Sequence, residues 1–125
     1  MAASNTPGLI VLRRYVGSIG ALLAALSVAL YLYASQDVAG PGTAAMLQAA
    51  GFGFAHGVAL AALAPLAQRP VALLGLGLLL AGVVMYCGGA LAQVVLAMAA
   101  GVALPIGAAL AITGWLLYAY DRLKV

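Results

Sequence analysis

The sequence predicts an all-α integral membrane protein, with four transmembrane helices packed as a bundle in a single membrane domain, residues 1–125. The composition is the first observation, because 67% of the residues are hydrophobic, 6% are charged and the mean hydropathy is +1.21. Soluble domains are about half apolar and about one quarter charged. The second observation is that four apolar runs, each near the length of about 20 residues that crosses a bilayer, occupy most of the chain. The third is that every charged residue falls outside these runs.

The first apolar run covers residues 15–34 and directly follows Arg13 and Arg14. The preceding residues 1–14 read as a short tail, because they include turn-forming residues such as Pro7 and Gly8. A basic flank before an apolar run also occurs in signal peptides, but this run is longer than the roughly 7 to 15 apolar residues of a signal core. We therefore expect a transmembrane helix that stays attached to the chain.

The second span is expected at residues 44–66, after a polar loop at residues 35–43 that contains Asp37. The sequence Gly40-Pro41-Gly42 disfavours continuous helix in that loop. The span ends near Pro65, and residues 67–70 are expected to turn the chain tightly.

The third span is expected at residues 71–91 and the fourth at residues 101–120. Gln93 is the one polar residue in the segment between them, which must reverse the chain. The fourth span ends in Trp115, Tyr118 and Tyr120, followed by charged residues. Aromatic residues next to charge are typical of a membrane interface, so we expect these three to act as interface anchors.

The basic residues predict the orientation. With four spans, all five lie on the side that holds both termini: Arg13, Arg14, Arg69, Arg122 and Lys124. Positive charge marks the cytoplasmic side, so we expect both termini in the cytoplasm. The net charge of +3 forms no basic patch and predicts no nucleic-acid partner. The Ala-, Gly-, Leu- and Val-rich composition favours a bacterial cytoplasmic (inner) membrane, with the mitochondrial inner membrane as an alternative.

Small residues recur four apart on the expected helices, which lets helices approach closely in lipid. The pairs are Gly20 with Ala24, Gly53 with Gly57, Gly77 with Ala81, and Gly107 with Ala111, and Gly114 extends the last row. Two interpretations stay open. These faces pack the four helices on one another, or some of them face partner subunits or a second copy of the chain.

His56 is the only ionisable side chain well inside a span, and such residues are functional candidates. As a neutral imidazole it can be satisfied by a hydrogen bond between helices. It can also bind a cofactor or ligand such as a haem, a quinone or a lipid headgroup. A proton relay is the third possibility, but it needs a chain of titratable groups, and no Asp, Glu or Lys lies in any expected span.

Helical spacing places Phe52, His56 and Leu60 on one side of the second span, with Gly53 and Gly57 on an adjacent face. We expect His56 to make a polar contact where a neighbouring helix comes nearest.

The remaining polar side chains in or near the spans predict no chemistry. For Tyr31, Tyr33, Tyr86 and Gln48 we expect interface anchoring or hydrogen bonds between helices. The single cysteine, Cys87, excludes an intrachain disulfide and a multi-cysteine metal site, and is expected to be a small buried apolar residue. No phosphate-binding loop and no nucleophile with a base and an acidic partner are present, so we expect no catalytic residues, no metal and no enzyme activity.

Several segments resemble one known family. They are Phe52 to Leu60 around His56, Met85-Tyr86, Leu104 to Ala108, and Gly114 to Leu117. Over residues 17–120 the chain resembles the domain-of-unknown-function family 423, which is similar to the transmembrane protein 256 family. The chain departs from the family pattern at Ala55 and at Gly82-Val83-Val84. The resemblance implies four transmembrane helices and no established activity.

Tiny loops, no room for a soluble module and no catalytic set favour an accessory or structural subunit within a larger membrane protein complex. The alternative is a small transporter or channel that works as an oligomer, for which chain length and span count are the only support. Binding of a haem, quinone or lipid through His56 is a third hypothesis.

Overall fold

The computed structural model describes residues 6–36, 40–99 and 101–124. These residues form four long helices and one short 3-10 helix: α1 (Pro7–Gln36), α2 (Thr43–Leu63), η2 (Ala64–Leu66), α3 (Pro70–Val95) and α4 (Ala103–Leu123). With η2 counted as part of the second span, each of the four is long and apolar enough to cross a membrane. The predicted fold class, an all-α bundle of four such helices, is confirmed.

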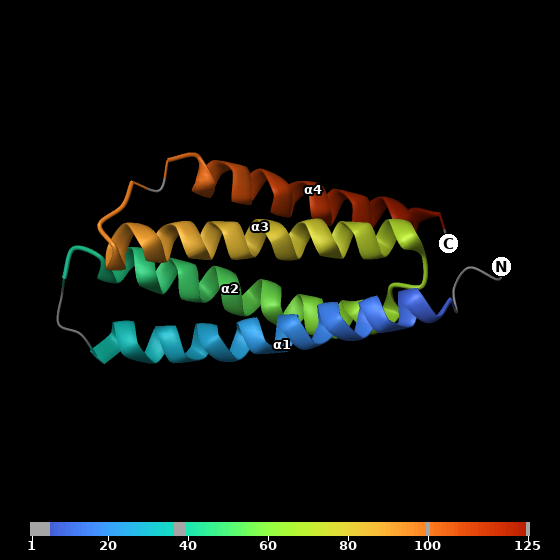
Figure 1. The fold of residues 1–125 in the computed structure, drawn as a ribbon, viewed down its shortest axis with the longest axis horizontal. Coiled ribbons are helices and arrows are strands. Elements are labelled where there is room, and N and C mark those ends of the chain that lie inside the picture. Colours follow the sequence, from blue (N-terminus) through green and yellow to red (C-terminus); the bar gives the residue numbers. More distant parts are fainter. Residues whose placement is uncertain (1–5, 37–39, 100, 125) are drawn as a thin grey trace.

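The helices alternate in direction and lie in the order α1, α2, α3, α4 (Figure 1). The most extensive contacts join α1 to α2 and α3 to α4, so the chain forms two helical hairpins. The hairpins meet where α2 packs on α3, whereas α4 makes no comparable contact with α1 or α2. The core therefore follows α3, where the side chains of Leu76, Leu79 and Val83 are fully enclosed.

Prolines mark several helix boundaries. Pro7 and Pro70 are the first residues of α1 and α3, a position where the missing N–H interrupts no helical hydrogen bond. Pro65 lies in η2, after α2 has ended, and Pro105 lies in the first turn of α4.

The first helix is longer than the expected span of residues 15–34 at both ends. It begins at Pro7 and includes Arg13 and Arg14, because Pro7 and Gly8 open a helix here instead of forming a tail. It also includes Ser35 and Gln36, which were expected in the loop. Thirty residues make a helix of about 45 Å, longer than the roughly 30 Å hydrocarbon core. Asp37 lies outside the described residues.

The connection between α3 and α4 is shorter than expected, because α3 continues through Gln93 to Val95. Leu96 caps the helix, and Ala97 then takes a left-handed conformation with φ of 51°. Gly101 has φ of 55°, which suits glycine, and α4 begins two residues later at Ala103.

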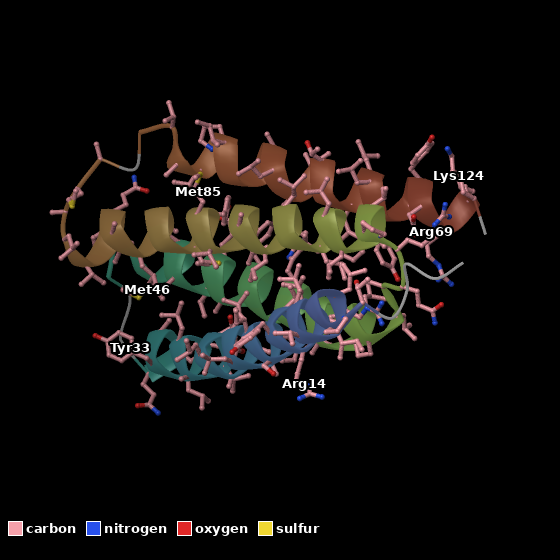
Figure 2. All side chains as sticks on the ribbon, turned by 45° about the vertical axis from the view of Figure 1, so that its right-hand side comes forward. Arg14, Tyr33, Met46, Arg69, Met85 and Lys124 are labelled. Carbon is pink, nitrogen blue, oxygen red and sulfur yellow. The ribbon has the colours of Figure 1, made fainter. Side chains whose placement is uncertain are left out.

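The start of α1, the end of α4 and the connection between η2 and α3 lie at one end of the bundle (Figure 1). The side chains of Arg69 and Lys124 lie at that end as well (Figure 2). An even number of antiparallel spans produces this arrangement.

Candidate functional site

The candidate site is built around His56 in the second half of α2. At a rise of about 1.5 Å per residue, His56 lies about 15 Å from Leu66 at one end of the span and about 20 Å from Thr43 at the other. The imidazole ring is therefore close to the middle of the second span.

The ring is held by its own helix. Nδ1 of His56 lies 2.7 Å from the backbone carbonyl oxygen of Phe52, one turn earlier. Because a carbonyl oxygen can only accept, Nδ1 carries the proton and donates it. In the neutral ring, Nε2 is then a hydrogen-bond acceptor.

Aromatic contacts link His56 to two other helices. The Phe52 ring lies 4.2 Å from the His56 ring and 4.4 Å from that of Tyr86 on α3, measured between centroids. On the other side of His56, the Trp115 ring on α4 lies 6.2 Å away. The ring planes of all three pairs are tilted to each other, by 38°, 35° and 55°. The four rings, here called the aromatic cluster, join α2, α3 and α4.

Three polar side-chain groups of the aromatic cluster have no hydrogen-bond partner among the described residues. They are Nε2 of His56, an acceptor, Nε1–H of Trp115, a donor, and the hydroxyl of Tyr86, which can do both. Trp115 is 37% exposed, and His56 Nε2 is not enclosed by the protein. Nε2 of His56 and part of the Trp115 side chain can therefore be reached from outside the bundle.

The glycines of α2 face a different neighbour. A Cβ atom at Gly57 would lie 2.7 Å from the backbone oxygen of Gly20 on α1, and one at Gly20 would lie 2.6 Å from Cβ of Leu60. Gly53 faces Ser27, also on α1. Helix α1 therefore approaches the glycine face, whereas Phe52 and His56 point toward α3 and α4.

Leu60 belongs to the glycine face and not to the His56 side, which differs from the expectation. Each residue turns an α-helix by about 100°, so Leu60 is rotated by about 80° from Phe52 after eight residues. His56 is rotated by only about 40°. The drift over two turns is enough to direct Leu60 to another helix.

Gly107 and Gly114 lie at the contact between α4 and α3. Gly107 faces the backbone of Gly82, and Gly114 faces that of Gly75. Sequence reasoning missed Gly75 and Gly82 and selected Gly77 with Ala81, yet a Cβ atom at Gly77 would meet nothing within 4 Å. The missed signal is the spacing, since both glycine pairs are seven residues apart.

The three expected interface anchors occupy different environments. Tyr118 is only 9% exposed and belongs to the core, with its backbone beside Gly75. Tyr120 is 51% exposed, and Nζ of Lys124 lies 4.5 Å above its ring. Trp115 reaches toward His56, about 12 Å from the end of α4.

The basic residues belong to α1, to the connection before α3 and to the end of α4. Arg69 pairs with Asp121 at 3.5 Å, and the carboxylate side chain is only 6% exposed. Arg13 donates to the backbone oxygen of Gln68 at 3.4 Å. The other three are exposed: Arg14, Arg122 and Lys124.

A separate groove of about 240 Å³ lies between α1 and α2. It is lined by Ser27, Val28, Tyr31, Ala50, Gly51 and Phe54. Nearby, the thiol of Cys87 on α3 lies 3.4 Å from the backbone oxygen of Ala49. This environment is nearly all apolar, so the groove suits hydrocarbon better than a polar ligand.

Within residues 6–36, 40–99 and 101–124, no three His, Cys, Asp or Glu side chains come together as a metal site. No protein-family model, curated protein or solved structure matches the chain.

Proposed function

We propose that this chain is a small integral membrane protein without catalytic activity of its own, which packs laterally against a partner subunit in a larger membrane protein complex. One observation carries the proposal: His56 Nε2, near the middle of a span, is an accessible acceptor with no donor among the described residues. An unsatisfied polar group away from water costs about 1–3 kcal/mol. A donor from a neighbouring protein removes that cost.

The architecture supports the same proposal. Helix α4 packs on α3 and leaves most of its surface uncovered, including the apolar side chains of Ile112 and Leu116. Helices in lipid associate through van der Waals contact and interhelical hydrogen bonds. The uncovered side of α4 and the free nitrogen of His56 offer a partner both kinds of contact.

The proposal includes an orientation. Five basic residues come from segments that meet at one end of the bundle, which supports cytoplasmic termini in an inner membrane. A reporter fused to the C-terminus that is active only in the cytoplasm tests this; activity of a periplasmic reporter at the same position contradicts it. We also propose that the chain belongs to the domain-of-unknown-function family 423. The four-helix architecture supports this membership.

The direct test is co-purification. The tagged full-length chain is extracted with a mild detergent, and the proteins that remain bound are identified by mass spectrometry. We expect one integral membrane protein to remain bound, and we expect His56→Ala to weaken its retention. Thr113→Val is the matched control, because the Thr113 hydroxyl is already bonded within α4, to the oxygen of Ala109. A chain that runs as a monomer with nothing bound contradicts the proposal.

A second candidate, haem binding through His56, has one supporting observation. A histidine that donates through Nδ1 to a backbone carbonyl presents Nε2 in the orientation used by metal-ligating histidines. The α1–α2 groove is lined by other residues, so a haem would have to lie on the surface between α2 and α4. An absorption spectrum that lacks haem bands, or that is unchanged by His56→Ala, removes this candidate.

A further inference from the structure

His56 and Trp115 offer complementary hydrogen-bonding groups side by side. Their rings are 6.2 Å apart and come from α2 and α4. Nε2 of His56 accepts, Nε1–H of Trp115 donates, and no hydrogen bond joins the two in the structure. A single group that both donates and accepts can satisfy both atoms.

The His56 ring has little freedom to turn its free nitrogen elsewhere. Rotation of the ring by half a turn breaks the 2.7 Å bond from Nδ1 to the Phe52 oxygen and places the ring carbon Cδ2 against that carbonyl, which leaves the Nδ1 proton without its acceptor. The Phe52 ring, 4.2 Å away, covers one side of the imidazole. The acceptor is therefore fixed in direction before any partner binds.

The surface beside this pair admits a helix. Ala59 follows His56 by three residues and is partly exposed, and Ala55 is exposed. Small side chains let a second helix approach α2 closely enough for a short polar side chain to reach Nε2. On the α4 side, Ile112 is 59% exposed and supplies apolar contact. We call these residues, with His56 and Trp115, the His56 surface.

We infer that the His56 surface binds a transmembrane helix of a partner protein, which presents a carboxamide or hydroxyl side chain (Asn, Gln, Ser or Thr) to His56 Nε2 and Trp115 Nε1. The inference rests on the proposed function, because it specifies the partner of the same site. A basic side chain of the partner has no acceptor oxygen to offer Trp115, and a carboxylate has no proton to offer His56. Carboxamides and hydroxyls supply both, and they are the polar groups that join helices in membranes.

Photo-crosslinking in native membranes tests the location. A photoreactive amino acid replaces Ala59 on the His56 surface or Leu22 on α1, where the native side chain is 59% exposed. We expect a crosslinked partner from position 59 and none from position 22. The crosslinked peptide should lie in a transmembrane helix and contain Asn, Gln, Ser or Thr.

Substitutions test the chemistry. His56→Ala and Trp115→Phe each remove one hydrogen bond, and we expect each to weaken crosslinking from position 59 by about tenfold, since an interhelical hydrogen bond contributes about 1–2 kcal/mol. His56→Gln keeps an acceptor oxygen and should retain most of the signal. Replacing the polar residue in the crosslinked peptide by Ala should reproduce the loss, and adding His56→Ala to it should cause little further loss.

The outcomes separate the two proposals. A chain that co-purifies with nothing and crosslinks from neither position overturns the proposed function together with this inference. A partner that crosslinks from position 22 alone, or whose crosslink at position 59 is unaffected by His56→Ala and Trp115→Phe, leaves the subunit role intact and overturns the inference. His56-dependent haem bands in the purified chain also overturn it. Circular dichroism of each purified variant confirms that its helices are formed.

Discussion

In the α3–α4 hairpin, a glycine of one helix packs against a glycine of the other at two positions along the helix axes, whereas in the α1–α2 hairpin this happens at one position. The two pairs of α3–α4 are Gly82 with Gly107 and Gly75 with Gly114. A Cβ atom at Gly82 would lie 2.5 Å from the backbone nitrogen of Ala111, and one at Gly114 would lie 2.5 Å from the backbone oxygen of Gly75. Backbone therefore lies against backbone at both of these positions.

The α1–α2 interface is less uniform. Its glycine pair, Gly20 with Gly57, leaves slightly more room, because a Cβ atom at Gly20 would lie 2.9 Å from the Gly57 oxygen. At the next level Gly53 meets side-chain atoms, namely the Ser27 hydroxyl and the Cys87 thiol. Side chains can move when backbone cannot, so this hairpin should tolerate added volume better. Stability should thus be more sensitive to glycine substitution in α3–α4.

Of four variants that test this comparison, Gly82→Ala in the α3–α4 hairpin should destabilise the protein most. The added methyl group would overlap backbone atoms of Gly107 and Ala111, so the two helices must separate. We expect a loss of about 3 kcal/mol in unfolding free energy, the upper part of the range for overpacked sites. The measurement is loss of helical circular dichroism in mixed micelles as denaturing detergent is added. Gly77→Ala is the control, since nothing lies within 4 Å of its Cβ position; equal losses for both variants would contradict the packing argument.

Gly20→Ala in the α1–α2 hairpin should also lower the unfolding free energy, but by less than Gly82→Ala does. Its methyl group would press on Cβ of Leu60 and on the Gly57 oxygen, at slightly longer distances than at Gly82. We expect about 2 kcal/mol by the same measurement. Gly17→Ala is the matched control on α1, because its nearest neighbour would be Cβ of Ala64 at an ordinary 3.5 Å. A larger loss at Gly20 than at Gly82 would reverse the order of the two hairpins.

Much of this fold follows from composition and hydropathy, because a chain in lipid must satisfy its backbone within each span, and long apolar runs then form helices. Helix ends are harder to predict. Pro7 and Gly8 suggest a turn when read alone, yet proline also begins helices, and α1 starts there. The rule that pairs small residues four apart selects Gly77 with Ala81 and passes over the true contacts at Gly75 and Gly82, which are seven residues apart. Which face is covered depends on the neighbouring helix.

The candidate site shows the same limit. His56 stands out in the sequence because no other His and no Asp, Glu, Lys or Arg lies inside an expected span. Its contact with Trp115 joins residues that are far apart in the chain, and a tryptophan near the end of an apolar run reads more simply as an interface anchor. The bond from Nδ1 to Phe52 is local, at a spacing of four residues, and the sequence alone contains both groups. Whether Nε2 has a hydrogen-bond partner depends on how α3 and α4 pack around α2, which the sequence does not show.

The connection at Gln68 and Arg69 holds the open ends of both hairpins, and Arg69→Gln should loosen only one of them. Arg69 pairs with the buried carboxylate of Asp121 on α4, whereas the Gln68 oxygen accepts from Arg13 on α1. Since Arg69 is about half exposed, we expect a loss of about 1 kcal/mol. Amide hydrogen exchange should rise in the last turn of α4 and stay unchanged in α1. Adding Asp121→Asn should recover part of the loss, because no charge is then left buried; faster exchange in α1 would show that the connection acts on both hairpins.

Gly53→Ala should have the smallest effect and should depend on Ser27. The added methyl group meets the Ser27 hydroxyl first and the Cys87 sulfur at 3.4 Å, and both belong to side chains. We expect less than about 1 kcal/mol, and Ser27→Ala in the same chain should reduce that loss, because it removes the oxygen in contact. A double-mutant cycle in mixed micelles measures this coupling. If Ser27→Ala does not reduce the loss, the backbone limits the approach of α1 to α2 here too, and both hairpins are equally intolerant of added volume. If Ser27→Ala does reduce the loss, the α1–α2 interface adjusts through its side chains, which the α3–α4 interface cannot do.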